Sequence, residues 1–376
     1  MEKHTLKQLD SVSIKPKKGV ALLPTFLYLD DEDVQATVDS LNRCNHVLIS
    51  VRKANGFETE LDSLNFKELD GIILDYRLDG NQEGGGVKYK APALAQELRN
   101  RITENQIPKD FPIILCSTDD RIKLLNSDET SNDLFDYRFL KNSELNTEKV
   151  SFILLTLVNG YKKISQSKGD LSRIIERDIN EIDDRVFSKF VDKKYPVHEI
   201  ARHINHQLIK ETGLLIHEGI LFARLGLVKN DDSIALVKKY FSDCLYRGVF
   251  YEGSTRWWMD KVNDKFKALT NRTLASVDAI QSVNLLKKST GLNLEDAKPI
   301  TLSHSNRFWT ICEFTGKPLD TIEGFKLANE PALSWQEPRY ISLLAIAEHA
   351  HTDASKGLLL HPSEKQRAEL ALETLN

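Results

Sequence analysis

The sequence feature that most constrains the fold is an apolar run that ends in a single carboxylate. Residues 71–80 read Gly-Ile-Ile-Leu-Asp-Tyr-Arg-Leu-Asp-Gly, so Asp75 follows four residues without a polar side chain. A short continuous apolar run is typical of a strand that is buried on both faces of a parallel sheet. Open α/β sheets place their binding and reacting groups at the carboxyl ends of such strands. The pattern therefore predicts a functional site at Asp75.

Other short apolar runs along the first 150 residues end in polar residues in the same way. They are Phe26–Leu29 before Asp30 and Asp31, His46–Val51, Pro112–Cys116 before Ser117, and Phe135–Leu140 before Lys141. Between the runs, apolar residues recur at helical spacing, for example Val34, Val38 and Leu41. Strands that alternate with helices predict an α/β fold with a parallel sheet and helices on both faces.

The residues that follow the predicted strands predict the chemistry of the site. In a parallel sheet the strand ends share one edge, so three carboxylates, a hydroxyl and an ammonium group should converge there. Clustered carboxylates call for a cation, and oxygen ligands select a hard one such as Mg²⁺. A carboxylate nucleophile beside Mg²⁺, with a lysine and a hydroxyl donor opposite, suits phosphoryl transfer.

Residues 20–165 resemble the receiver domain of bacterial two-component response regulators. The resemblance is carried by Asp30-Asp31, Asp75, Ser117 and Lys141 in their order, and by the proline-plus-apolar run that ends in Ser117. It implies a flavodoxin-like, doubly wound, five-stranded parallel sheet in a cytoplasmic bacterial protein. It also implies that Asp75 is a phosphoacceptor, supplied by a partner histidine kinase or phosphotransfer protein.

The same resemblance implies a role for each residue of the site. Asp31, Asp75 and the backbone carbonyl of Arg77 would bind Mg²⁺, and Asp30 would hold the ion through water. Ser117 would donate a hydrogen bond to the phosphoryl group, and Lys141 would pair with it. Because Thr118 follows Ser117, the register at this position stays open by one residue.

The sequence also departs from the family pattern. Asn142 follows Lys141 where the family usually has proline, and the loop 81–86 is unusually rich in glycine. The family's aromatic switch position is Arg138, flanked by Tyr137 and Phe139 as the candidate switch aromatics. A receiver that folds without being phosphorylated is an alternative to the phosphoacceptor hypothesis.

The second half is expected to be a mainly helical domain over residues 166–376, after an N-terminal arm over 1–19 and the receiver over 20–165. Apolar residues between Leu171 and Val191 recur every three or four positions, which predicts a long amphipathic helix and makes it the candidate surface for a homodimer. A polar cluster of Glu348, His349, His351 and Asp353 is either a metal or general-base site or a solvated helix end. The half resembles no family that we can name.

Composition limits the classes of function. The chain has 376 residues, 51 basic and 55 acidic side chains and a net charge of −4, which argues against a general binder of nucleic acid or membrane surfaces. No window reaches the 18 to 20 apolar residues, roughly, of a membrane span, so a soluble intracellular protein is expected. A length of this size predicts two domains.

Three functional hypotheses follow. The first is a response regulator whose helical half acts by contact with other proteins. The second is a receiver that serves as a phosphate sink and has no output of its own. The third is an enzyme that phosphorylation switches, with catalytic residues in the C-terminal half. No enzymatic activity is predicted beyond gain and loss of the phosphoryl group on the receiver aspartate.

Overall fold

The computed structural model describes residues 22–78, 88–118, 133–141, 146–191, 194–328, 333–352 and 357–375. Its N-terminal part contains a five-stranded, wholly parallel sheet with strand order β2-β1-β3-β4-β5. The strands are β1 (Thr25–Leu29), β2 (Leu48–Arg52), β3 (Gly71–Asp75), β4 (Ile113–Ser117) and β5 (Tyr137–Leu140). This is the flavodoxin-like order, so the predicted fold class and the predicted strands are confirmed.

The position of each strand in the sheet follows from its sequence. All five residues of β3 and all five of β4 are buried, as their continuous apolar runs predict for strands covered on both faces. The edge strand β2 alternates instead, with Leu48 and Ser50 exposed and Ile49 buried. Apolar content therefore places β3 and β4 inside the sheet and leaves β2 at its edge.

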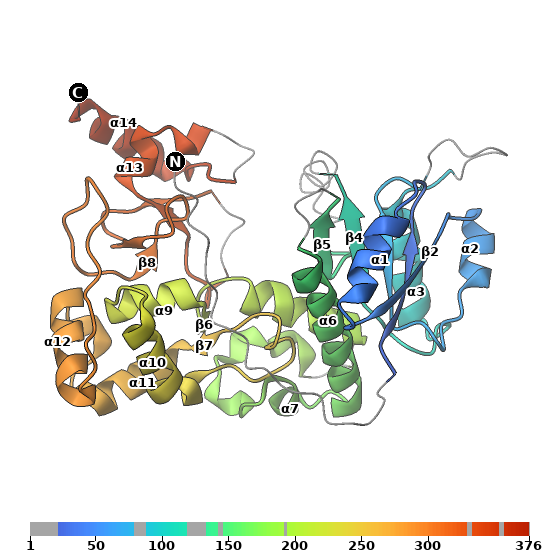
Figure 1. The fold of residues 1–376 in the computed structure, drawn as a ribbon, viewed down its shortest axis with the longest axis horizontal. Helices are drawn as coiled ribbons and strands as arrows, with labels where there is room; N and C mark the ends of the chain where they lie inside the picture. The colour runs from blue at the N-terminus through green and yellow to red at the C-terminus, as the bar shows by residue number, and fades with distance from the viewer. Residues whose placement is uncertain are drawn as a thin grey trace.

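Helices cover both faces of the sheet (Figure 1). Helix α1 (Gln35–Arg43) and the long helix α6 (Thr147–Ser167) share one hydrophobic cluster with the sheet side chains of that face, such as Tyr28 and Phe139. Helices α2 (Phe57–Ser63) and α3 (Ala91–Thr103) share a second cluster on the opposite face. We call residues 22–167 the α/β unit.

The helix predicted over residues 171–191 is wrong. The segment forms α7 (Leu171–Ile175) and then three single 3₁₀ turns, η1 (Ile179–Glu181), η2 (Asp184–Val186) and η3 (Ser188–Phe190). Glu176 ends α7 in the left-handed conformation, at φ 55°, and the side chains of Asp178 and Asp183 cap the first two turns. The apolar residues expected to pair with a second copy are largely buried within this chain, and a homodimer through this segment stays a prediction.

Residues 171–375, which we call the helical remainder, contain mostly short helices. Besides α7, its α-helices among the described residues are α8 (Val197–Arg202), α9 (Glu218–Leu225), α10 (Asp231–Tyr240), α11 (Met259–Thr270), α12 (Ala279–Thr290), α13 (Leu343–Ala347) and α14 (Lys365–Glu373). A π-helical segment, η4 (His203–Ile209), continues α8, and 3₁₀ turns lie at Ser242–Cys244, Leu274–Ser276, Ala350–Thr352 and Pro362–Glu364. Two-residue antiparallel pairs join β6 (Leu215–Ile216) to β7 (Trp257–Trp258), β8 (Thr310–Ile311) to β9 (Pro318–Leu319), and β10 (Phe325–Lys326) to β11 (Tyr340–Ile341).

One hydrophobic core joins the α/β unit to the helical remainder. The cluster under α1 and α6 continues through Ile174, Phe187 and Ile204 to Trp258. The predicted domain boundary at residue 165 falls inside the last turn of α6. In Figure 1 the light green segment that begins with α7 lies directly beside α6, and the later helices α9 to α12 lie farther away. Among the described residues, no helix is both long and apolar enough to cross a membrane.

Candidate functional site

The carboxyl-terminal edge of the sheet carries the side chains that the sequence predicted there. Asp75 is the last residue of β3, Ser117 is the last residue of β4, and Lys141 directly follows β5. Asp30 and Asp31 directly follow β1, the neighbour of β3. Because the strands are parallel and in register, all of these residues emerge at one edge.

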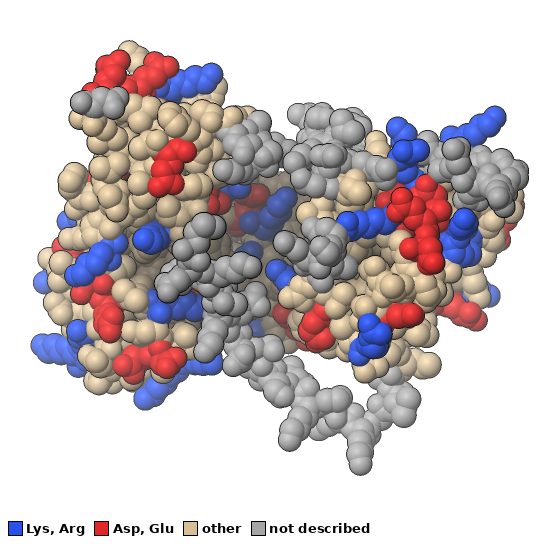
Figure 2. Space-filling model, turned by 45° about the horizontal axis from the view of Figure 1, so that its top comes forward, with Lys and Arg blue, Asp and Glu red and all other residues tan. Residues whose placement is uncertain are grey.

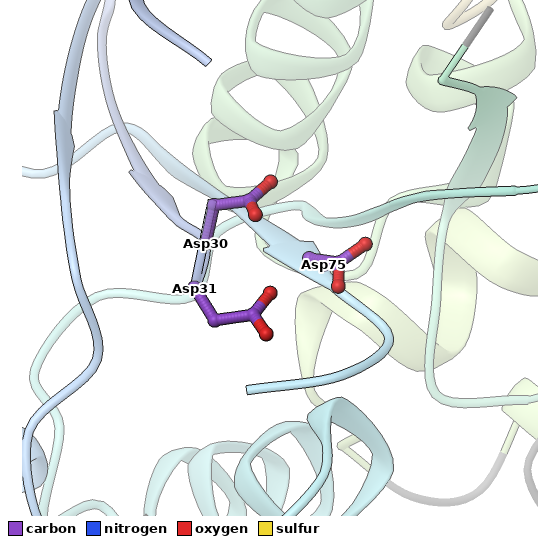
Figure 3. A group of neighbouring side chains, drawn as sticks. All are labelled: Asp30, Asp31 and Asp75. Atoms are coloured by element: carbon purple, nitrogen blue, oxygen red, sulfur yellow. The ribbon is translucent and has the colours of Figure 1, made fainter. Parts of the chain in front are cut away.

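Three carboxylates meet at this edge. Asp30, Asp31 and Asp75 each offer an oxygen atom, and these atoms lie within 4.8 Å of one another. Figure 3 shows the side chains of Asp30 and Asp31 next to each other and close to Asp75 at the end of β3. Asp30 and Asp75 are fully buried, and Asp31 is half-buried. A compact set of oxygen ligands of this kind suits Mg²⁺.

Lys141 is the cation of the cluster. Its Nζ donates a hydrogen bond of 2.9 Å to Asp30 Oδ1 and lies 2.7 Å from the other oxygen of that carboxylate. The same Nζ lies 3.2 Å from Asp75 Oδ1. One ammonium group thus contacts two of the three carboxylates, and the cluster of three aspartates and one lysine keeps an excess of negative charge.

The local backbone fixes these carboxylates. Asp75 Oδ2 accepts a 2.9 Å hydrogen bond from the backbone N–H of Arg77, and Asp30 Oδ1 accepts one of 3.0 Å from that of Glu32. Both are contacts of a carboxylate with the residue two positions on, which is typical of a turn after a strand. The predicted role of the Arg77 carbonyl as a metal ligand stays a prediction.

Burial changes the acidity of the site. It raises the pKa of Asp75; the charge of Lys141 opposes this, and the charge of Asp30 adds to it. Burial also raises the pKa of Asp31. For Lys141, burial alone would lower the pKa, but the hydrogen bond to Asp30 and the charges of Asp75 and Asp30 raise it. The lysine therefore stays protonated at neutral pH.

The structure favours Ser117 over Thr118 as the hydroxyl of the site. Ser117 is fully buried, and its Oγ has no hydrogen-bond partner among the described residues. Thr118 is exposed. A buried hydroxyl without a partner is costly in a folded chain unless a ligand or water satisfies it. Ser117 thus retains a donor at the same edge as Asp75.

Two residues of this region were not predicted from the sequence. The carboxylate of Glu32 lies 3.5 Å from Lys141 Nζ, although its side chain is largely exposed. Tyr28 is fully buried, and burial raises its pKa, with the charges of Cys116 and Asp30 adding to the effect. Side chains two residues apart on a strand share a face, so the spacing of Tyr28 and Asp30 was a usable signal.

The candidate switch aromatics lie on the face of β5 that packs against α1 and α6. Phe139 belongs to the core cluster of that face, and Tyr137 packs against it. Arg138, between them, points to the opposite face because side chains alternate along a strand. The role of Tyr137 and Phe139 in a switch stays a prediction.

The C-terminal polar cluster lies at the end of α13, in a different part of the molecule. Glu348 and His349 are exposed, and the His349 and His351 ring centres lie 6.4 Å apart. Asp353 lies outside the described residues. Among the described residues, the group of three or more acidic, histidine or cysteine side chains that could hold a metal is the aspartate cluster, and the histidines are not part of it.

Figure 2 shows acidic side chains gathered on the α/β unit with Lys and Arg beside them.

Comparisons with known proteins add little beyond this geometry. No family model matches the chain. No curated protein matches it either.

Similar solved structures include a response regulator receiver domain protein from Clostridium thermocellum, with 15% identity, 37% of this chain and 98% of that one covered, and a TM-score of 0.27. FixJ from B. japonicum has 16% identity, with 48% and 86% covered and a TM-score of 0.27. NtrX from Brucella abortus has 16% identity, with 54% and 40% covered and a TM-score of 0.30. Likenesses at this level decide no function, so the strand order and the site geometry carry the argument.

Proposed function

We propose that this chain is a response-regulator-like protein in which Asp75 accepts a phosphoryl group from a histidine kinase or a phosphotransfer protein. One observation carries the proposal: Asp30, Asp31, Asp75 and Lys141 come from three strand ends and form one largely buried ionic cluster. A turn aspartate without a function would be expected in water. Three carboxylates held together at a largely buried edge are unfavourable for folding, because each loses hydration and repels the other two, and a functional role explains why they are there.

The charge of the cluster fits Mg²⁺. Three aspartates and one lysine leave two negative charges when all are ionised, which is the charge that one divalent ion neutralises. Asp30, Asp31 and Asp75 would hold the ion, and their oxygen atoms are the ligands that it prefers. Bound there, Mg²⁺ would offset the negative charge of the phosphoryl oxygens.

The residues of the chain account for the transfer step. A carboxylate oxygen of Asp75 attacks the phosphorus of a phosphohistidine and forms a P–O bond. The P–N bond breaks, its electron pair goes to the imidazole, and the imidazole is protonated as it leaves. Lys141 lies 3.2 Å from Asp75 Oδ1, where its ammonium group can pair with the incoming phosphoryl oxygens. Ser117 supplies a hydroxyl donor that has no other partner in the described chain.

Phosphorylation by a small donor tests the proposal. The full chain is incubated with acetyl phosphate and Mg²⁺ and analysed on Phos-tag gels and by intact mass, with Asp75→Asn and Asp39→Asn in parallel. Asp39 lies on the exposed face of α1, so Asp39→Asn is a matched loss of one carboxylate outside the cluster. We expect one phosphoryl group on the wild type and on Asp39→Asn, lost without Mg²⁺, and none on Asp75→Asn. Equal labelling of all three chains, or of none, would refute the proposal.

The helical remainder is proposed to act by contact with other proteins. The phosphate-sink alternative makes a different prediction, because a sink drains phosphate from a kinase without a change in its own partners or oligomeric state. Cross-linking and size-exclusion chromatography of phosphorylated and unphosphorylated chain separate the two readings. An unchanged profile with all added kinase phosphate consumed would favour the sink.

A further inference from the structure

A buried ionic network joins the helical remainder to the α/β unit at the edge of the sheet opposite the site. We call it the joint, and its members are Arg99, Asp110, Asp136, Tyr161 and His198. The first four belong to the α/β unit, and His198 belongs to α8. The side chains of Arg99, Asp110, Asp136 and His198 are at most 8% exposed, and Tyr161 is 3% exposed.

Every member of the joint contacts the next. His198 donates its backbone N–H to Asp110 Oδ2 at 2.7 Å, and its Nδ1 lies 2.8 Å from the same oxygen. Asp110 Oδ1 lies 3.2 Å from an Arg99 nitrogen, and the other terminal nitrogen of Arg99 lies 2.7 Å from Asp136 Oδ2. Tyr161 donates a hydrogen bond of 2.5 Å to Asp136 Oδ1. Removing one buried member would leave the remaining buried groups without a partner, so the joint acts as a unit.

The joint lies at the beginning of the two strands that deliver the phosphoryl-binding side chains. Asp110 precedes β4, which ends in Ser117, and Asp136 precedes β5, which is followed by Lys141. At the joint, Asp136 Oδ2 accepts a 2.8 Å hydrogen bond from the backbone N–H of Ile113. At the site, the Lys141 N–H donates a 2.9 Å hydrogen bond to the Ser117 carbonyl. The same two strands are thus tied together at both ends.

The part of the helical remainder that binds these strand starts is unusual in its own geometry. Residues 197–209 form α8 and the π-helical segment η4. Besides His198, this segment contributes Arg202, which donates to the Asp133 carbonyl at 2.9 Å, and Asn205, which donates to the Asp136 carbonyl at 3.3 Å. π-helical turns are rare, and they occur frequently at functional sites. The segment is therefore a candidate for a two-state element.

We propose that the phosphorylation state of Asp75 is read inside the same chain, by the segment 197–209, through β4 and β5. The inference rests on the proposed phosphoacceptor function and names its first reader. A phosphoryl group on Asp75 draws Lys141 away from Asp30 and engages Ser117, which repositions the ends of both strands. Their other ends meet the joint, so a shift of β4 against β5 changes the contacts of His198, Arg202 and Asn205.

The response is a local change in the segment and not a separation of the two parts. Ile204 and Leu208 of the segment are at most 2% exposed and belong to the core cluster that also contains Phe139 and Leu154. Undocking the helical remainder would expose this shared core to water, which is unfavourable in proportion to the apolar area. A change of helical form within residues 203–209 can keep the core buried.

Hydrogen exchange of the full chain tests the inference. Backbone exchange of residues 197–209 is followed by mass spectrometry with and without acetyl phosphate and Mg²⁺, in the wild type and in Asp75→Asn. We expect a change of about fivefold or more in the exchange rate of this segment only in the phosphorylated wild type. Helix α12 (Ala279–Thr290) serves as the internal reference and should not change. A chain that is fully phosphorylated but shows no change in 197–209 overturns the inference and leaves the phosphoacceptor proposal standing; a chain that takes no phosphate overturns both.

Coupling is reciprocal, so the joint should also affect the site. The affinity for beryllium trifluoride with Mg²⁺, a phosphoryl mimic, is measured in His198→Gln and in Arg202→Ala. Lys287→Gln, on α12, is the control. We expect the affinity of at least one of these two variants to change about fivefold or more, with the control unchanged. If His198→Gln does not fold, the partly exposed Arg202 provides the test. Unchanged affinity in each of the two variants that folds would overturn the inference.

Discussion

Asp136→Asn should be among the most destabilising single changes in the α/β unit. The carboxylate is fully enclosed and accepts from the Arg99 guanidinium at 2.7 Å, from Tyr161 at 2.5 Å and from the backbone N–H of Ile113 at 2.8 Å. Asparagine has nearly the same shape but no charge, and its amide nitrogen cannot accept. Among the described residues, Arg99 would then keep only Asp110 as a charged partner. Breaking a buried ion pair from one side costs about 3–5 kcal/mol, and we expect a loss of this size.

Two further variants define the scale of this effect. Tyr161→Phe removes the hydrogen bond to the buried Asp136 carboxylate and a long 3.5 Å contact from Arg99, for which we expect about 1.5–3 kcal/mol. Asp243→Asn removes a surface pair with Lys265 that is largely exposed, for which we expect less than about 1 kcal/mol. Equilibrium unfolding in urea, followed by circular dichroism, gives the free energy of unfolding of each chain with a common m-value.

The order of the three losses decides the argument. The joint is a structural unit only if Asp136→Asn costs more than Tyr161→Phe, and Tyr161→Phe costs more than Asp243→Asn. If Asp136→Asn and Asp243→Asn lower the free energy of unfolding by the same small amount, the network is not buried in solution as the structure has it. The proposal that residues 197–209 respond to the state of Asp75 through this network would then lack support. A double variant of Asp136→Asn with Tyr161→Phe should be less than additive, because both remove the same contact.

Two more predictions concern the site and the packing of α6. Because burial raises the pKa of Asp75, the fold disfavours its ionised form; Asp75→Asn should therefore raise the Tm at neutral pH without Mg²⁺. The gain should shrink as the pH falls through that raised pKa, since the wild-type carboxyl then becomes neutral, and a lower Tm at neutral pH would contradict this reasoning. A Cβ on Gly160 would lie 2.1 Å from the Phe250 ring of the helical remainder, so Gly160→Ala should cost about 1–3 kcal/mol in urea unfolding. Gly56→Ala, whose Cβ would meet only an atom at 3.8 Å, should be neutral or slightly stabilising, and equal effects of the two changes would argue against close packing at α6.

The candidate site could be predicted because its signal is local. Strands β3 and β4 are short apolar runs, and the polar residue that each contributes to the candidate site is its last residue. The parallel arrangement then brings Asp30, Asp75, Ser117 and Lys141 to one edge without any further information. Strands β3 and β4 are buried on both faces, and a strand in that position needs a continuous apolar sequence, so these two runs could be assigned to the centre of the sheet.

The segment 171–191 shows why the same reasoning failed in the second half. Apolar spacing of three and four residues fits a long helix, but it also fits short turns that each place one side chain in a core. Asp178 and Asp183 accept hydrogen bonds from backbone N–H groups two positions on and begin new turns. These capping residues could be read from the sequence. The turns, however, are stabilised by packing into a core that α6 and α8 help to form, and the local spacing of apolar residues carries no information about that core.

The sequence alone determined the α/β class, the runs that form the sheet and the residues at its carboxyl-terminal edge, because local apolar pattern predicts strand burial and the alternation of strands with helices predicts a parallel sheet. Only the tertiary structure decided that the two halves share one core and that Arg99, Asp110, Asp136 and His198 meet in it. Charged residues far apart in sequence are expected on the surface when each is considered singly. Their burial depends on partners as much as 88 residues away, such as Asp110 and His198, and that pairing exists only once the chain has folded.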